Sequence, residues 1–271
     1  MEQKNVVIIT GASSGMGKEF VKQVDVCFPN VDEIWLIARR KEVLEELALS
    51  CKHSCRTLAY DLSEKTSLES LRYLLQTEQP SIQLLVNSAG YGILGLFCNA
   101  ETSEPITKSG LYNEEQLKDQ TGMISLNCEA LTAMTYLCIP FMKRDGRIIQ
   151  LASSAAFLPQ PKFAVYAATK SYVLSFSRAL NEELRQLPVY VTAVCPGPVD
   201  TEFFERAEKG SDTLFIKKIV MAKPKNVVAK ALKDSQNKKE VSVYGIWMQL
   251  FYFMSKILPH KFLLMIMRTM K

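Results

Sequence analysis

Short apolar runs alternate with longer amphipathic stretches along most of this chain. Apolar, β-branched runs of strand length are followed repeatedly by segments in which apolar residues recur with helical spacing. The pattern predicts strands at residues 5–10, 33–38, 56–60, 83–86, 146–152, 189–194 and 241–244. It predicts helices at residues 18–26, 67–76, 113–142 and 163–187, and a long loop at 91–112.

Strands that alternate with helices form βαβ units, and such units build a parallel sheet with helices on both faces. We therefore expect an α/β fold, a Rossmann-type doubly wound parallel sheet of about seven strands in a single domain. Residues 1–245 would form this domain, and residues 246–271 an apolar C-terminal helical extension. In folds of this kind ligands bind beyond the carboxyl ends of the strands.

A glycine-rich turn, TGASSGMG, ends the first predicted strand and precedes a helix. The backbone N–H groups of such a turn, together with the helix N-terminus, form a phosphate site. Gly11 lets the chain turn, Gly15 lets the backbone approach a pyrophosphate, and Gly17 lets the helix pack on the sheet. The cofactor contacts predicted in this turn are Gly11, Ser13, Ser14, Gly15, Met16 and Gly17.

The second predicted strand ends in two arginines. In NAD enzymes a carboxylate about 20 residues after the glycines holds the ribose hydroxyls. Here Ala38 is followed by Arg39 and Arg40, and guanidinium groups suit a 2′-phosphate. We therefore expect NADP(H) rather than NAD, with both arginines at the 2′-phosphate. The alternative interpretation is a solvated basic start of a helix.

The stretch after the fifth predicted strand, SSAAFLPQPKFAVYAATK, holds the candidate catalytic residues. Tyr166 and Lys170 lie one turn apart on one helix face. An ammonium group favours the ionised phenol, so we expect Lys170 to lower the pKa of Tyr166 from its usual ~10. Ser153 can hold a carbonyl oxygen while Tyr166 exchanges a proton with it. Alone, such a Tyr–Lys pair is more often an exposed helix face.

Other polar residues stand at strand ends or inside a helix. Asp61 is placed to meet an adenine, and Asn87 to tie neighbouring strands. Asn127 lies near the middle of a predicted helix, where asparagine is a poor residue, so we expect it to have a specific polar task. A loop as long as 91–112 is uncommon without a role, and Tyr91 at its start is a candidate substrate contact.

From Val6 to about Thr201 the chain resembles the short-chain dehydrogenases/reductases. The matching stretches are TGASSGMG, Asp61-Leu62, NSAG, Asn127, Ser153, YAATK and PGPVDT. Within the family, the chain is similar to NADPH-preferring members, to DltE-like reductases, and to hydroxysteroid and long-chain 3-oxoacyl reductases. The loop at 93–112 is longer than the family pattern, which bears on the rim of the substrate pocket. The C-terminus lacks the family's usual short strand-and-loop ending, so we expect a homodimer rather than the standard tetramer.

The resemblance implies roles for individual residues. Tyr166 is the acid/base, Ser153 orients the substrate carbonyl, and Lys170 lowers the pKa of the tyrosine and binds the nicotinamide ribose. Asn127 completes a tetrad by holding a proton-relay water through a bent helix backbone. The substrate contacts expected are Ser153, Tyr166 and Tyr91. The further cofactor contacts expected are Asp61, Leu62, Asn87, Ala89, Gly90, Tyr166, Lys170, Pro196, Gly197, Val199 and Thr201.

Composition bears on compartment and partners. The seven cysteines are scattered, and the N-terminus carries no signal-peptide pattern, so we expect reduced thiols and a cytoplasmic protein. Cys51 and Cys55 flank His53, but no second pair stands at zinc-finger spacing, so we expect no metal.

The net charge of +5 is modest, and the basic residues of the chain gather near the cofactor edge and in the tail. A nucleic-acid partner is therefore not supported.

The tail from residue 241 to 271 has no acidic residue and carries Lys256, Lys261, Arg268 and Lys271. Its two apolar blocks fall short of the ~18 residues of a transmembrane helix. We expect short apolar helices that line an apolar substrate site as a lid or seal a dimer; contact with an anionic membrane surface is the alternative. Its apolar residues include Trp247, Leu250, Phe251, Phe253, Met254, Phe262, Leu263, Leu264, Met265 and Met267.

These observations predict an oxidoreductase that transfers a hydride between NADP(H) and the carbonyl or alcohol of a hydrophobic substrate. A steroid, a bile acid or an oxo-lipid-like ketone fits that description. The alternative is a catalytically silent NADP(H)-binding sensor, or a partner protein at a membrane surface. The intact Ser–Tyr–Lys–Asn set favours the enzyme, because a silent binder needs only the glycine turn.

Overall fold

A seven-stranded sheet forms the centre of the computed structural model, which describes residues 3–97, 114–203, 221–259, 261, 263 and 265. Its strands run in the order β3-β2-β1-β4-β5-β6-β7, and each neighbouring pair is parallel. The predicted doubly wound α/β fold is confirmed. The strands are β1 (Asn5–Thr10), β2 (Glu33–Ala38), β3 (Ser54–Ala59), β4 (Ser81–Asn87), β5 (Met142–Leu151), β6 (Tyr190–Val194) and β7 (Val241–Ser242).

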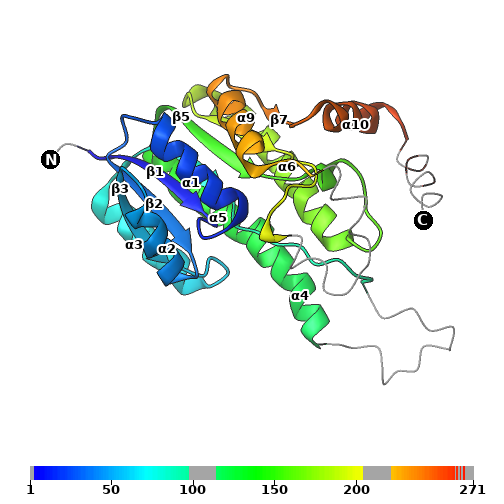
Figure 1. Ribbon diagram of the computed structural model, residues 1–271, viewed down its shortest axis with the longest axis horizontal. Coiled ribbons are helices and arrows are strands. Elements are labelled where there is room, and N and C mark those ends of the chain that lie inside the picture. The colour runs from blue at the N-terminus through cyan, green and yellow to red at the C-terminus, as the bar shows by residue number, and fades with distance from the viewer. Residues whose placement is uncertain are drawn as a thin grey trace.

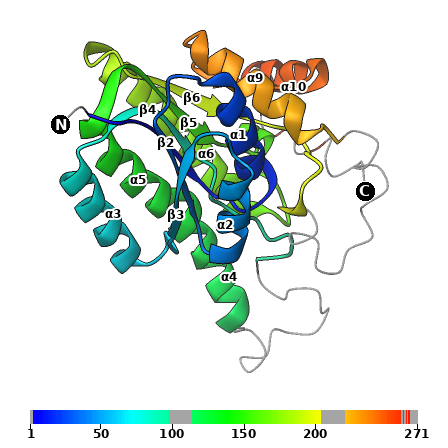
Figure 2. The ribbon, with the colours of Figure 1, turned by 60° about the vertical axis from the view of Figure 1, so that its left-hand side comes forward.

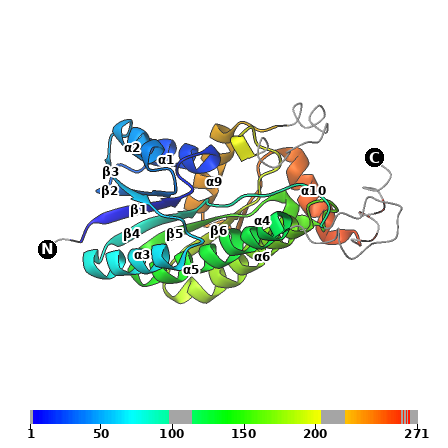
Figure 3. The same ribbon diagram turned by 90° about the horizontal axis from the view of Figure 1, so that it is seen from below.

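Helices cover both faces of the sheet, as Figures 1 and 3 show. One face carries α1 (Gly15–Cys27), α2 (Lys41–Leu49) and α9 (Pro224–Gln236). The other face carries α3 (Lys65–Glu78), α4 (Glu114–Ile124), α5 (Leu131–Cys138) and α6 (Ala164–Glu183). On this second face α3 and α5 lie side by side (Figure 2).

The alternation of side chains along β2 explains the two cores. Ile34 and Leu36 point into the cluster beneath α1 and α2, whereas Trp35 and Ile37 point into the cluster beneath α3 and α5. Successive side chains of a strand face opposite sides of the sheet. Because both faces are covered, the strand reads as a continuous apolar run rather than an alternating one.

The long helix predicted at 113–142 is divided into parts. After α4 comes a π-helical turn, η1 (Ser125–Ala130), followed by α5 and a 3₁₀ turn, η2 (Ile139–Phe141). Strand β5 then begins at Met142 rather than at the expected residue 146. The stretch Glu114–Phe141 is long and apolar enough to cross a membrane, but 44% of its most apolar window is buried inside this fold.

Other bounds differ by a few residues from those predicted. Helix α6 ends at Glu183 and a 3₁₀ turn, η4 (Leu184–Gln186), completes the stretch expected to reach residue 187. Strand β7 ends at Ser242, two residues earlier than expected. Of the loop expected at 91–112, residues 98–113 lie outside the described part of the chain.

Helix α9 is an element that the sequence pattern did not predict here. Pro224 stands at its first turn, where proline is favoured. Val227, Val228, Ala231 and Leu232 give it one buried face, and it packs against α1. Both signals, a proline at the first turn and apolar residues at helical spacing, are present in the sequence and would have predicted this helix.

The tail begins with helix α10 (Ile246–Ile257), at the predicted start of the apolar extension. Figures 1 and 3 place this helix at one end of the molecule, beyond the edge of the sheet. Its residues Met248, Phe251 and Tyr252 pack on the cluster that contains Phe157 and Cys195. Of the apolar residues expected in the second tail helix, Phe262, Leu264 and Met267 lie outside the described residues.

Asp25 fixes the turn between α2 and β3. It is buried in α1 and accepts hydrogen bonds from the backbone N–H groups of Lys52 and His53, each at 2.9 Å. The His53 ring lies 2.9 Å from the same carboxylate, so it is engaged with Asp25, while the Cys55 thiol donates to the His53 carbonyl at 3.5 Å. Burial by itself raises the pKa of Asp25, but these hydrogen bonds outweigh it and hold the pKa below its usual value.

We expect Asp25→Ala to lower the free energy of unfolding by about 2–4 kcal/mol, because two backbone donors lose their acceptor. Urea unfolding measures the change, with Glu46→Ala on the exposed face of α2 as the control. A carboxylate with a lowered folded pKa stabilises the fold above its unfolded pKa of about 3.9. The gap between wild type and variant should therefore shrink as the pH falls through the folded pKa of Asp25. Equal stability of the two at neutral pH contradicts this role.

Candidate active site

Thr10, at the end of β1, joins the glycine turn to the segment that follows β4. Its Oγ1 accepts hydrogen bonds from the N–H groups of Ser88 and Ala89, at 3.0 and 3.1 Å. Gly11 has a φ of +67°, and a Cβ there would lie 2.9 Å from the Ala89 backbone. The predicted turn at Gly11 is confirmed, and it lets two neighbouring strand ends approach closely. Thr10 itself was not among the predicted residues.

The glycine turn lies against the segment after β6. A Cβ on Gly17 would stand 2.1 Å from the carbonyl oxygen of Gly11, so only glycine fits where α1 packs on the turn. A Cβ on Gly15 would be 3.5 Å from the side chain of Thr201. The structure therefore brings together two of the predicted cofactor segments, residues 11–17 and 196–201.

Of the two arginines after β2, Arg40 contacts the glycine turn and Arg39 contacts Asp61. Arg40 donates to the backbone oxygen of Ser13 at 2.9 Å and to its hydroxyl at 3.3 Å. It also pairs with Glu202 at 3.8 Å. Arg39 pairs with Asp61 at 3.7 Å, on the β3 side. Arg40 therefore contacts Ser13 in the glycine turn and Arg39 contacts Asp61 after β3, while binding of a 2′-phosphate by these arginines stays a prediction.

The carboxylate of Asp61 is held ionised. Burial alone raises its pKa, but hydrogen bonds from Ser63 and the charge of Arg39 lower it below the usual value. Ser63 donates from both its backbone N–H and its hydroxyl. The cation of Arg39 and the anion of Asp61 thus share one edge of the site.

Lys170 is buried beneath the end of β5. Its Nζ donates a hydrogen bond of 2.6 Å to the carbonyl oxygen of Leu151. Burial lowers the pKa of Lys170 to about 8, while the nearby thiols of Cys128 and Cys195 act in the opposite direction. Near neutral pH the ammonium therefore remains charged in a site with little solvent.

Tyr166 is buried among aromatic rings. It stacks on Phe163 with 4.2 Å between ring centroids and meets Phe203 at 5.5 Å in a tilted arrangement. Burial raises its pKa to about 12, although a hydrogen bond from Ser153 lowers it. The expectation that Lys170 lowers this pKa below ~10 is therefore wrong for this structure. The ammonium group is 5.7 Å from the ring centroid and bonded to Leu151.

Ser153 directs its hydroxyl toward the hydroxyl of Tyr166. It caps a 3₁₀ turn, η3 (Ser154–Phe157), by accepting from the N–H of Ala155 at 3.1 Å. The N–H of Ser154 donates to the carbonyl oxygen of Pro196 at 2.8 Å. The segment bearing the serine is thus fixed to the segment after β6, and Ser153 faces the Tyr166 hydroxyl.

Asn127 holds the chain that leaves β4. Its Nδ2 donates to the Tyr91 carbonyl at 2.9 Å and to Thr169 Oγ1 at 3.1 Å, and its Oδ1 accepts from the Tyr91 N–H at 3.0 Å. A Cβ on Gly90 would lie 2.8 Å from that oxygen and 3.5 Å from Lys170 Nζ. The residue lies in the π-helical turn, which supplies the predicted bend. Its expected task of holding a relay water stays a prediction.

Asn87 makes a contact that differs from the one expected. Instead of tying strands together, it donates to Thr135 Oγ1 on α5 at 3.0 Å. Gln150, its register partner on β5, donates to the same oxygen at 2.9 Å. Thr135 and Gln150 were not predicted, because strand register and helix packing bring them together. Through these hydrogen bonds Thr135 joins β4 and β5 to α5.

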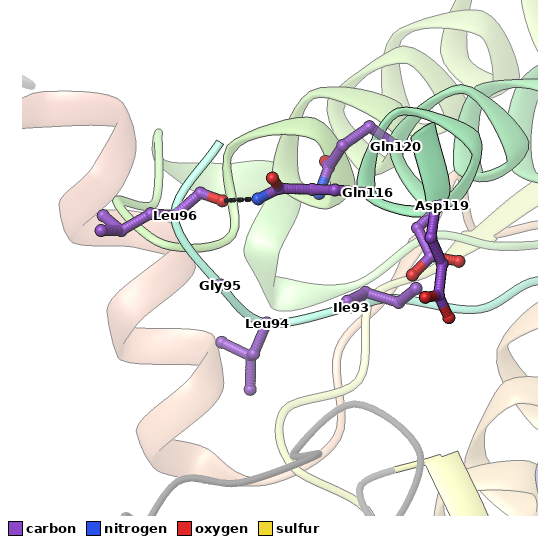
Figure 4. Close-up of a pocket in the computed structure, with 8 residues that line it drawn as sticks. Ile93, Leu94, Gly95, Leu96, Gln116, Asp119 and Gln120 are labelled. Carbon is purple, nitrogen blue, oxygen red and sulfur yellow. Dashed lines mark hydrogen bonds between the residues drawn. The ribbon is translucent and has the colours of Figure 1, made fainter. Parts of the chain in front are cut away.

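A cavity of about 220 Å³ opens beside the chain after β4 and the start of α4 (Figure 4). Gln116 spans it, donating to the Leu96 carbonyl at 2.8 Å, and Asp119 and Gln120 line it. The hydroxyl of Tyr91 donates to the backbone oxygen of Asp119 at 3.3 Å. Tyr91 is thus bound to α4 by its hydroxyl, and its role as a substrate contact stays a prediction.

Helix α10 covers the segment after β6. A Cβ on Gly197 would be 2.6 Å from the sulfur of Met248, so the helix rests on the backbone predicted to line a nicotinamide. Tyr252 and Phe251 pack their rings on Phe157, with centroids 4.7 and 5.9 Å apart. The apolar tail therefore reaches the 3₁₀ turn that carries Ser153.

Comparison with known proteins agrees with this arrangement. The short chain dehydrogenase family model matches residues 5–212. An uncharacterized oxidoreductase of Staphylococcus epidermidis is 29% identical over 210 residues, which cover 77% of this chain and 84% of that protein. The NADP-dependent 3-hydroxy acid dehydrogenase YdfG of Shigella flexneri is 31% identical over 214 residues, covering 76% of this chain and 78% of the relative.

A solved structure has the same architecture. The short-chain dehydrogenase from Sphingobium yanoikuyae, in complex with NADPH, superimposes with a TM-score of 0.73 at 27% identity. The match covers 88% of this chain and 87% of that chain. It therefore extends past the family-model match into the C-terminal part of the fold.

Gly92 lets Tyr166 and Phe163 stack beside the chain that leaves β4, because a Cβ there would lie 2.6 Å and 2.9 Å from their rings. We expect Gly92→Ala to lower the free energy of unfolding by about 1–3 kcal/mol through overpacking. The double variant Gly92→Ala/Phe163→Ala should lose less free energy of unfolding than the two single variants lose together, because removing the Phe163 ring makes room for the new Cβ. Urea unfolding of all four proteins tests this, and additive losses would contradict it.

Proposed function

Because this chain belongs to the short-chain dehydrogenase family, it is an oxidoreductase, and we propose that it transfers a hydride between NADP(H) and the carbonyl or alcohol of a hydrophobic substrate. The observation that carries this proposal is the convergence of Ser153, Tyr166 and Lys170. Ser153 caps η3, Tyr166 and Lys170 lie on α6, and the three meet at the carboxyl end of β5. That edge of the sheet also carries the glycine turn.

The proposed chemistry divides between the cofactor and the protein. NADP(H) supplies or accepts the hydride. The hydroxyl of Ser153 holds the substrate oxygen, and Tyr166 exchanges a proton with that oxygen. With its pKa raised to about 12, Tyr166 is protonated near neutral pH, which is the state that reduction of a carbonyl needs. Lys170 supplies a buried positive charge that favours loss of the proton in the transition state.

NADP(H) is supported as the cofactor by charge and by the relatives. Arg40 lies on Ser13 at the rim of the glycine turn, with Arg39 beside it, and no carboxylate stands at the end of β2 to hold a free ribose hydroxyl. The YdfG relative is NADP-dependent, and the Sphingobium structure holds NADPH. A guanidinium group binds a phosphate through charge-assisted hydrogen bonds, and this chemistry favours NADP(H) over NAD.

A hydrophobic substrate is supported by the surroundings of the Tyr166 ring. Phe163 and Phe203 flank it, and Met123 and Ile93 belong to the same apolar cluster. On the neighbouring side α10 brings Met248 over Gly197. Methionine and aromatic side chains adapt to bulky apolar ligands. The tail thus contributes to the wall of the proposed substrate site.

A substrate screen tests the proposed function directly. Purified protein is mixed with NADPH and a panel of steroid, 3-oxoacyl and simple ketones, and loss of the cofactor absorbance is followed. We expect turnover of the larger apolar ketones. Cofactor binding without turnover of any ketone would instead support a silent NADP(H)-binding protein.

Replacing Tyr166 by phenylalanine keeps the stacked ring and removes the proton. We expect kcat to fall by about 10²–10⁴-fold, while the Kd for NADPH barely changes. Tyr172→Phe is a matched control, because Tyr172 lies on the exposed side of the same helix. Turnover like that of the wild type in Tyr166→Phe would remove this phenol from the mechanism.

Arg39→Ala and Arg40→Ala test the assignment of the 2′-phosphate. Each lost charge-assisted contact to the 2′-phosphate weakens NADPH binding by about 1.5–3 kcal/mol. We therefore expect either change to narrow the preference for NADPH over NADH tenfold or more. Lys41→Ala provides the control, because the ammonium of Lys41 pairs with Glu45 on α2. The measurement is kcat/KM for both cofactors. Equal values in the wild type would refute the assignment.

A further inference from the structure

One side of α10 presents a continuous apolar surface, here called the α10 outer face. Its members recur at helical spacing and are each between 39% and 73% exposed. A contiguous exposed apolar surface of this kind marks an interaction site rather than ordinary surface. The α10 outer face consists of Ile246, Trp247, Leu250, Phe253, Met254 and Ile257.

The opposite side of α10 packs against the rest of the fold. Tyr252 packs on Phe157 with 4.7 Å between ring centroids, Met248 rests on Gly197, and Ser255 is buried. Turning the helix to hide its outer face would expose this inner side. The helix is therefore apolar on two sides, and only one of them packs against other described residues.

Charge indicates what the α10 outer face contacts. Residues 241–271 contain no acidic residue but several cations. Lys256 stands between the two apolar sides, with its ammonium 4.3 Å over the Tyr252 ring, and Lys261 is exposed. A symmetric contact between two copies would bring these cations together, whereas an anionic surface would neutralise them.

Length decides between lying on a bilayer and crossing it. Helix α10 has 12 residues, too few to span the ~30 Å hydrocarbon core. Its sequence holds one tryptophan, one leucine, two phenylalanines, two isoleucines and two methionines, with a lysine in the last turn. Such helices lie in the plane of the membrane interface. Figure 1 shows α10 at one end of the molecule, beyond the edge of the sheet.

We propose that the α10 outer face docks on an anionic lipid bilayer, with α10 parallel to the membrane plane. Trp247, Leu250 and Phe253 enter the boundary between headgroups and acyl chains, and the lysines contact lipid phosphates. The proposal stands on the shape and charge of the tail, and it holds whether or not the protein turns over a ketone.

The chain contains its own reporter for this contact. Of its two tryptophans, Trp35 is 1% exposed in the sheet core and Trp247 is 73% exposed on the α10 outer face. A change in tryptophan emission on addition of vesicles therefore reports Trp247. The experiment uses the full chain with phosphatidylcholine vesicles, and with the same vesicles containing phosphatidylglycerol, followed by flotation and fluorescence.

We expect the protein to float with the anionic vesicles, its emission to shift to the blue, and both effects to weaken as salt rises. Leu250→Glu/Phe253→Glu should reduce binding at least tenfold. Leu49→Glu/Tyr73→Glu, which adds the same charges at exposed apolar sites on α2 and α3, should leave it unchanged. Lys256→Gln should weaken binding by roughly fivefold, the share of one cation near an anionic surface. Circular dichroism checks that each variant is folded.

Three results would overturn the proposal. The first is the absence of binding, or equal binding to vesicles with and without phosphatidylglycerol. The second is a dimer in solution that Leu250→Glu/Phe253→Glu converts to a monomer, since the α10 outer face would then contact a second copy. The third is a monomer whose Trp247 emission is blue before vesicles are added and unchanged after, since the chain would then cover this face itself.

Discussion

The hydrogen bond from Lys170 to the Leu151 carbonyl is the contact on which the site depends. It joins the end of β5 to α6 at 2.6 Å, and it places a cation where burial disfavours charge. Tyr166 lies one turn away and Ser153 two residues after Leu151, so the same contact sets the spacing of all three groups. Any shift of α6 along the sheet would separate the phenol from the serine that faces it.

The sequence was sufficient to predict the seven strands in chain order and the edge at which the motifs meet, whereas helices α2 and α9 were not predicted. Apolar runs of strand length are recognisable because strands buried on both faces are mostly apolar, as Ile34–Ile37 of β2 shows. The glycine turn was predictable for a similar local reason, because Gly11 and Gly17 sit where no side chain fits. Motifs at strand ends needed only the rule that parallel strands place their carboxyl ends together.

What the sequence did not reveal depends on contacts between distant segments. Nothing near Asn87 indicates that its partner is Thr135, because that pairing follows from how α5 lies on β4 and β5. The π-helical turn around Asn127 has no simple sequence signal. The pKa of Tyr166 was predicted in the wrong direction because spacing reveals the neighbouring lysine but not the extent of burial. Burial emerges only once Phe163 and Phe203 flank the ring.

The close approach of Met248 to Gly197 couples the tail to the segment predicted to line the nicotinamide. A Cβ at position 197 would lie 2.6 Å from the sulfur of Met248, so a larger residue there requires the methionine side chain or α10 itself to shift. Conversely, a displacement of α10 would uncover the backbone at position 197. The position of one helix beyond the sheet thus determines how much of this strand end is open to a ligand.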